Sequence, residues 1–92
     1  MRDEHRILII KEGDMLVAQC LEYDVCTQAP SFAELQRRMD TLMELEARLG
    51  LKEAGAEYGH LGPAPKHFHD MWDSALPFEA SRTGRKMAMA KR

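Results

Sequence analysis

Residues 6–20, which read RILIIKEGDMLVAQC, contain two apolar runs joined by Glu12, Gly13 and Asp14. Two apolar runs separated by so short a glycine-containing segment are typical of a β-hairpin. The pattern predicts strands over residues 6–11 and 15–20, with Gly13 at the positive φ that the loop needs. Because the first run is apolar on both faces, we expect this strand to be covered on both sides or to meet a second subunit on one.

Downstream of the hairpin, residues 21–24 form a connection and residues 25–28 a third strand, which ends at Pro30 because proline cannot donate to a ladder. Ser31 and Glu34 have the spacing of a capping box, and apolar residues then recur at helical spacing as far as Leu49. Gly50 stands where a left-handed C-terminal glycine belongs. The pattern predicts a helix over residues 32–49 that covers one face of the sheet.

The C-terminal part of the chain is less periodic. Residues 51–62 hold three glycines and are predicted to form a loop, and the prolines at 63 and 65 precede a short helix that starts near residue 65. We expect an α+β fold: a three-stranded antiparallel sheet covered by one long helix, with a second short C-terminal helix. Residues 1–78 form the predicted domain, and residues 79–92 are predicted to be a basic, disordered tail.

The net charge of −2 is unevenly distributed over the 92 residues. Residues 1–80 have a balance of −7, whereas residues 81–92 contain five basic residues and no acidic one. An acidic body disfavours nucleic acid and suits a basic protein partner. A chain of this length also buries only a modest core, so we expect a homodimer that buries further apolar area.

Two cysteines, Cys20 and Cys26, lie in or beside predicted strands and suggest no disulfide framework. No run approaches the roughly 18 apolar residues of a membrane span. The N-terminus carries both signs of charge before only four apolar residues, too few for a signal-peptide core. We therefore expect a cytoplasmic protein without membrane contact.

Several features of residues 15–35 occur in a fixed order. Val17-Ala18 lie in a strand, an acidic connection follows, Thr27-Gln28 lie in the third strand, and Ser31 and Glu34 begin the helix. In this order they resemble the core of the HicB family, and the resemblance covers residues 6–49. The chain also departs from the family pattern. It has Cys20 and Leu21 where the family has a proline in the connection, no glycine near residues 25–26, and Ala29 in place of the glycine that follows Thr-Gln.

The resemblance implies a partly RNase H-like sheet with one helix on a face, in a family whose fuller members neutralise a small basic toxin ribonuclease. Such members carry a C-terminal helix-turn-helix or ribbon-helix-helix, whereas residues 63–77 supply only one short helix, so DNA binding is not expected. The chain would then be a non-catalytic binding module, either an antitoxin or a stand-alone HicB-like protein. A different hypothesis is a small acidic inhibitor that covers a nucleic-acid-binding complex by charge mimicry.

Four residues are candidates for partner contact. Glu22, Tyr23 and Asp24 form an acidic–aromatic loop that is predicted to be exposed, and by resemblance it lies near the toxin-facing surface. Trp72 belongs to a residue type enriched at interface centres, although the favoured interpretation is that it docks its own helix on the sheet.

A metal-dependent nuclease is the remaining alternative, and it needs carboxylates that converge on the ion. The candidates are Asp14, Glu22 and Asp24, but Asp14 suits a hairpin turn and the other two suit a loop. His67 and His69 are two residues apart and would point away from each other on a helix. We therefore predict no enzymatic activity, no metal and no cofactor.

Overall fold

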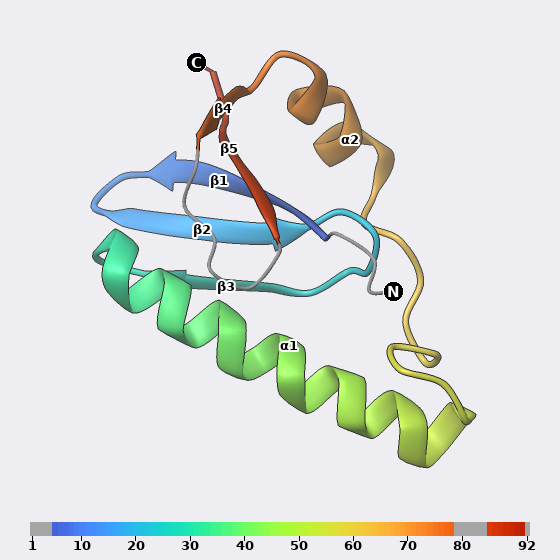
Figure 1. Cartoon of the computed structure of the whole chain (residues 1–92). Coiled ribbons are helices and arrows are strands. Elements are labelled where there is room, and N and C mark those ends of the chain that lie inside the picture. The colour runs from blue at the N-terminus through green and yellow to red at the C-terminus, as the bar shows by residue number, and fades with distance from the viewer. Residues whose placement is uncertain (1–4, 79–84, 92) are drawn as a thin grey trace.

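The computed structural model describes residues 5–78 and 85–91 as an α+β fold with one five-stranded mixed sheet and two helices (Figure 1). The strands are β1 (Arg6–Glu12), β2 (Met15–Cys20), β3 (Cys26–Ala29), β4 (Leu76–Phe78) and β5 (Lys86–Met89). The helices are α1 (Phe32–Ala54) and α2 (Lys66–Asp73). The strand order across the sheet is β3-β2-β1-β5-β4.

The predicted hairpin is confirmed. Strands β1 and β2 pair antiparallel from Ile7 opposite Cys20 to Glu12 opposite Met15, and Gly13 in the turn has a φ of 60°. Strand β3 continues the antiparallel order on the other side of β2, where Leu16 pairs with Ala29. The three predicted strands therefore form and pair as the periodicity indicated.

The sheet has two more strands than the predicted three. β5 pairs parallel to β1, with Ile7 opposite Met87 and Leu8 opposite Ala88, and β4 pairs antiparallel to β5 at the edge. The predicted boundary at residue 78 is therefore wrong for residues 85–91, which form β5 or directly flank it. The rest of the predicted tail, residues 79–84 and 92, lies outside the described residues.

α1 is longer than predicted, because it passes Gly50 and ends at Ala54 with Gly55 in the left-handed conformation. Its start is as predicted, since the Ser31 hydroxyl accepts from the backbone N–H of Glu34 at 3.3 Å. Gly50 is buried where the next loop crosses the helix, and a Cβ there would lie 2.4 Å from the backbone nitrogen of Tyr58. Glycine at position 50 thus permits a close backbone approach instead of ending the helix.

The sheet has an α1 side and an α2 side (Figure 1). On the α1 side, alternate residues of three central strands share one cluster with the buried face of the helix. These residues are Ile7, Ile9, Ala18, Cys20, Met87, Leu35, Met39 and Met43. The intervening residues, including Leu8, Gln19 and Ala88, face the α2 side. Over Ile7–Ile9 β1 is therefore covered on both faces, the first of the two expected arrangements.

α2 confirms the predicted second helix, since it begins at Lys66, close to the predicted start near residue 65. Pro77 lies within β4, an edge strand, where a residue without an N–H is tolerated.

Candidate functional site

The connection after β2, residues 21–25, is fixed by three backbone hydrogen bonds to Arg6 and to residues 62–64. Leu21 N–H donates to the carbonyl of Arg6 at 3.0 Å, and the carbonyl of Leu21 accepts from Ala64 N–H at 3.1 Å. Asp24 N–H donates to the carbonyl of Gly62 at 2.8 Å. A loop with its backbone fixed in this way presents its side chains in defined directions.

Glu22 turns toward the start of β1. Its Oε1 accepts from the backbone N–H of Arg6 at 2.8 Å, and its Oε2 accepts from Arg6 Nε at 2.5 Å. Burial raises the pKa of this carboxyl, but the hydrogen bonds from Arg6 outweigh burial and leave the pKa below its ordinary value. Glu22 is therefore an ionised, half-buried anchor of the loop and not a fully exposed charge.

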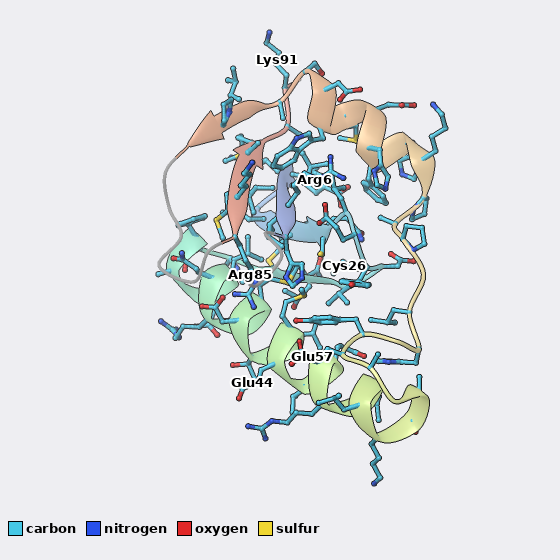
Figure 2. All side chains as sticks on the ribbon, turned by 45° about the vertical axis from the view of Figure 1, so that its right-hand side comes forward. Arg6, Cys26, Glu44, Glu57, Arg85 and Lys91 are labelled. Carbon is cyan, nitrogen blue, oxygen red and sulfur yellow. The ribbon has the colours of Figure 1, made fainter. Side chains whose placement is uncertain are left out.

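Arg6 connects Glu22 to α2. Its guanidinium carbon lies 5.9 Å from the centroid of the Trp72 ring, within the range of a cation–π contact. Figure 2 shows Arg6 on the α2 side of the sheet, whereas Arg85 lies toward α1, where its Nη1 donates to Asp40 Oδ1 at 2.6 Å. The structure thus brings Glu22 and Trp72 together through one arginine.

Asp24 is exposed and lies beside the same face. Gln19, which pairs with Leu8 and is only 3% exposed, donates from Nε2 to Asp24 Oδ1 at 3.0 Å and to the Cys20 carbonyl at 2.9 Å. A buried amide therefore orients an exposed carboxylate. The surface formed by Arg6, Glu22, Asp24 and Trp72 is called the loop–α2 surface below.

Tyr23 does not join this surface. Its ring stacks on Tyr58 with centroids 4.4 Å apart and meets His5 edge-on at 5.6 Å, and it packs against the cluster on the α1 side. Tyr58 is buried at a φ of 60°, and burial raises the pKa of its phenol, which is hydrogen-bonded to Arg85. The prediction of an exposed acidic–aromatic loop is therefore wrong for Tyr23, whose role is packing.

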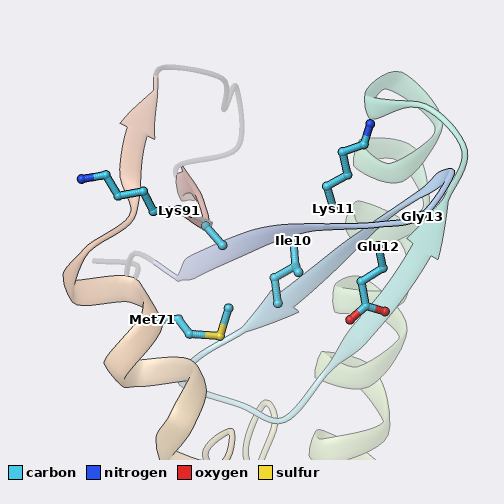
Figure 3. A pocket seen from close by; sticks show the side chains of 7 residues that line it. Ile10, Lys11, Glu12, Gly13, Met71 and Lys91 are labelled. Carbon is cyan, nitrogen blue, oxygen red and sulfur yellow. The ribbon is translucent and has the colours of Figure 1, made fainter.

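A hollow on the α2 side lies near the hairpin turn and has a volume of about 340 Å³ (Figure 3). Ile10 of β1 and Met71 of α2 contribute apolar lining, and Glu12, Lys11 and Lys91 stand around it. Arg6, Gln19 and Ile10 are not among the residues that the sequence singled out for partner contact. Strand alternation was the one available signal, since it places Arg6, Leu8 and Ile10 on the same face of β1.

The candidate nuclease carboxylates do not converge. Asp14 lies in the turn between β1 and β2, whereas Glu22 binds Arg6 at the opposite end of the hairpin, a strand length of roughly 20 Å away. His60 Nε2 lies 2.7 Å from Glu46 Oε1, and the His67 ring packs on Phe68 with centroids 4.0 Å apart. Within residues 5–78 and 85–91, no three metal-ligating side chains gather into a site.

The two cysteines are free and differ in environment. Cys20 is fully buried, and burial raises the pKa of its thiol, which disfavours the reactive thiolate; Cys26 is exposed on β3.

Neither helix in the described part of the chain is both long and apolar enough to cross a membrane.

Comparison with known proteins adds no relative. Neither protein-family models, nor curated proteins, nor solved structures gave a match to this chain.

Proposed function

We propose that this chain is a non-catalytic protein-binding module that recognises a basic protein through the loop–α2 surface. The observation that carries the proposal is the pre-ordered connection: Arg6 and Gln19 fix two carboxylates, Glu22 and Asp24, and the Arg6 guanidinium lies 5.9 Å from the Trp72 ring centroid. Carboxylates and an aromatic side chain held in place before binding reduce the ordering cost of complex formation.

The HicB resemblance makes the partner more specific. The connection that carries Glu22 and Asp24 is the segment that the resemblance associates with toxin contact. The meander β3-β2-β1 with a parallel strand beyond β1 is consistent with a partly RNase H-like sheet. We therefore propose an antitoxin-like role in the cytoplasm, with a small basic toxin ribonuclease as the partner.

Charge mimicry of nucleic acid is the second candidate, and the structure offers it less support. The hypothesis rested on an acidic body separated from a basic tail. Arg85 and Lys86 instead belong to the folded part, and residues 5–78 and 85–91 carry ten Lys/Arg against twelve Asp/Glu. A nearly balanced surface is a poor substitute for a phosphate backbone.

The proposal is tested by affinity capture from the source lysate with the tagged full chain and two charge-reversal variants. Asp24→Lys reverses the exposed carboxylate of the loop–α2 surface. Asp14→Lys is the matched control, because Asp14 is also exposed but lies in the hairpin turn. We expect one small basic protein to be retained by the wild type and by Asp14→Lys and to be lost with Asp24→Lys.

Two results would contradict the proposal. Equal loss of the partner with both variants would mean that overall charge, and not this surface, determines binding. Capture of a nucleic-acid-binding complex whose retention falls steeply with salt for every variant would support charge mimicry instead.

A further inference from the structure

Four large hydrophobic side chains are strongly exposed among the described residues, and three of them lie in the C-terminal half of α1. Leu45 is 56% exposed, Leu49 39% and Leu51 52%. Exposed leucines that adjoin one another on a helix can mark an interaction surface, whereas singly scattered ones are ordinary. This part of α1 extends past the end of the sheet (Figure 1), and the loop that follows it covers only the side on which Gly50 lies.

Two of these leucines continue a stripe. Leu42, Leu45 and Leu49 are three and four residues apart and lie on one side of the helix, whereas Leu51 is six residues from Leu45 and about 120° around the helix from it. Leu42 is half-buried and packs against the core, so the stripe runs from the edge of the core to exposed surface. The stripe of Leu42, Leu45 and Leu49 is called the leucine stripe below.

The side of α1 that carries the leucine stripe is fixed by two contacts. Arg38, four residues before Leu42, donates from Nη1 to the carbonyl of Gln28 in β3 at 2.7 Å. Asp40, on the other flank of the helix, pairs with Arg85 next to β5. The leucine stripe therefore lies along the β3 edge of the molecule, away from the loop–α2 surface.

We propose that the leucine stripe is the contact surface for a second copy of this chain, packed with the two α1 helices antiparallel. In the register that places Leu42 opposite Leu49 of the second copy, Arg38 lies opposite Glu53 of the second copy, since each is four residues further out. Glu53 is exposed. Arg38 already pairs with Glu34 of its own helix and donates to the Gln28 carbonyl, which leaves three of its five N–H donors for a further partner. A two-fold axis repeats both the leucine contacts and the ion pair.

This self-complementarity favours a second copy over an unrelated partner. A partner of one charge sign would match only one end of the stripe, because Arg38 and Glu53 have opposite signs. The contact is small, since the three leucines span roughly 10 Å of helix, so we expect a weak dimer that dissociates at about 10–100 µM. Packing through α1 leaves the loop–α2 surface accessible on the opposite side of the sheet.

The test is sedimentation velocity of the full chain from about 5 to about 500 µM, which brackets the expected Kd. We expect the wild type to shift from monomer to dimer over this range and Leu45→Glu to stay monomeric. Leu51→Glu is the matched control, because it introduces the same charge at a similarly exposed leucine of the same helix outside the stripe. Circular dichroism establishes that both variants remain folded.

The register is tested with a second pair of variants. Glu53→Arg places like charges opposite Arg38 and is expected to weaken dimerisation at least threefold, whereas Glu57→Arg, an equally simple reversal beyond the end of α1, is expected to have little effect. A wild type that stays monomeric at every concentration would overturn the proposal. Equal dimerisation of Leu45→Glu and Leu51→Glu would overturn it as well, and neither result bears on partner binding by the loop–α2 surface.

Discussion

The two sides of β1 show how one strand serves two purposes. On the α1 side, Ile7 and Ile9 are at most 1% exposed and lie in the continuous cluster beneath α1. On the α2 side, Leu8 is buried, but Ile10 is half-buried beside an open hollow and Arg6 binds Glu22 and Trp72. Neighbouring residues of nearly the same chemistry therefore face a closed core on one side and an accessible surface on the other.

The difference indicates where stability and function are separated. On a close-packed side, each methylene removed lowers the free energy of unfolding, because the surrounding side chains relax only partially into the cavity. A side with a short helix and a hollow tolerates change and can contact a partner. Substitutions on the α1 side should therefore affect folding first, and substitutions on the α2 side should affect binding first.

The largest effect is expected from removing β5, which contributes to both sides. A chain that ends at Phe78 lacks Met87 of the α1 side and Ala88 of the α2 side, and it leaves one edge of β1 unpaired. We expect the free energy of unfolding of this shortened chain to fall by more than about 5 kcal/mol, which is the whole stability of many small domains. Thermal unfolding followed by circular dichroism measures this loss.

The control for this truncation removes only residues 91 and 92, after the end of β5, and should leave the melting temperature unchanged. If the chain that ends at Phe78 melted like the full chain, residues 79–92 would be the dispensable tail that their composition suggested.

Two isoleucines in the same strand sharpen the comparison of the sides. Ile9→Ala removes a side chain that is 1% exposed on the α1 side and should cost about 3 kcal/mol of unfolding free energy. Ile10→Ala removes the same atoms from a half-buried position and should cost about 1 kcal/mol. Urea titration of both variants measures the difference, and equal costs would mean that the α2 side is as closed as the α1 side.

Gly50 offers a third test, on the outer end of the α1 side. Alanine normally stabilises a helix interior by about 1 kcal/mol relative to glycine. At position 50 the new Cβ would meet backbone atoms of residues 56–59 at 2.4–2.7 Å, so Gly50→Ala should instead destabilise the fold by about 2 kcal/mol. Gly62→Ala is the control, since nothing lies within 4 Å of its added Cβ. A gain in stability for Gly50→Ala would contradict the loop placement.

The same residues show what the sequence could predict. The hairpin and the start of α1 follow from local signals: alternating apolar residues, a turn glycine and the Ser31 cap. β5 does not, because alanine and methionine carry little strand preference and its position depends on β1, some 80 residues earlier in the chain. Gly50 resembled a stop signal because a glycine that permits close approach and one that ends a helix look alike in sequence.

The candidate site was predictable only in part, for a related reason. The sequence indicated acidic residues in the connection, but it did not predict on which side of the sheet each of them lies. Successive loop residues follow no fixed period, so Tyr23 could turn to the α1 side between two carboxylates on the α2 side. The role of Arg6 depends on a contact across 16 residues, which no local pattern encodes.

The smallest expected effect concerns the charge that anchors the loop on the α2 side. Because the hydrogen bonds from Arg6 lower the pKa of Glu22 in the folded state, its contribution to stability is fully present above the unfolded value of about 4.3. The contribution is lost as the pH falls through the lower folded value. Glu22→Gln should therefore cost about 1 kcal/mol at neutral pH, and the difference from wild type should vanish in acid.

Glu44→Gln is the control for this pH dependence, since Glu44 pairs with Arg48 on α1 at 63% exposure, where ion pairs contribute little. Unfolding free energies of the wild type and both variants are compared between about pH 7 and pH 3, on either side of the ordinary glutamate value. A Glu22→Gln profile parallel to that of the wild type would show that the Arg6 contact does not hold the connection. The loop–α2 surface would then not be pre-ordered by Arg6, even if the fold were correct.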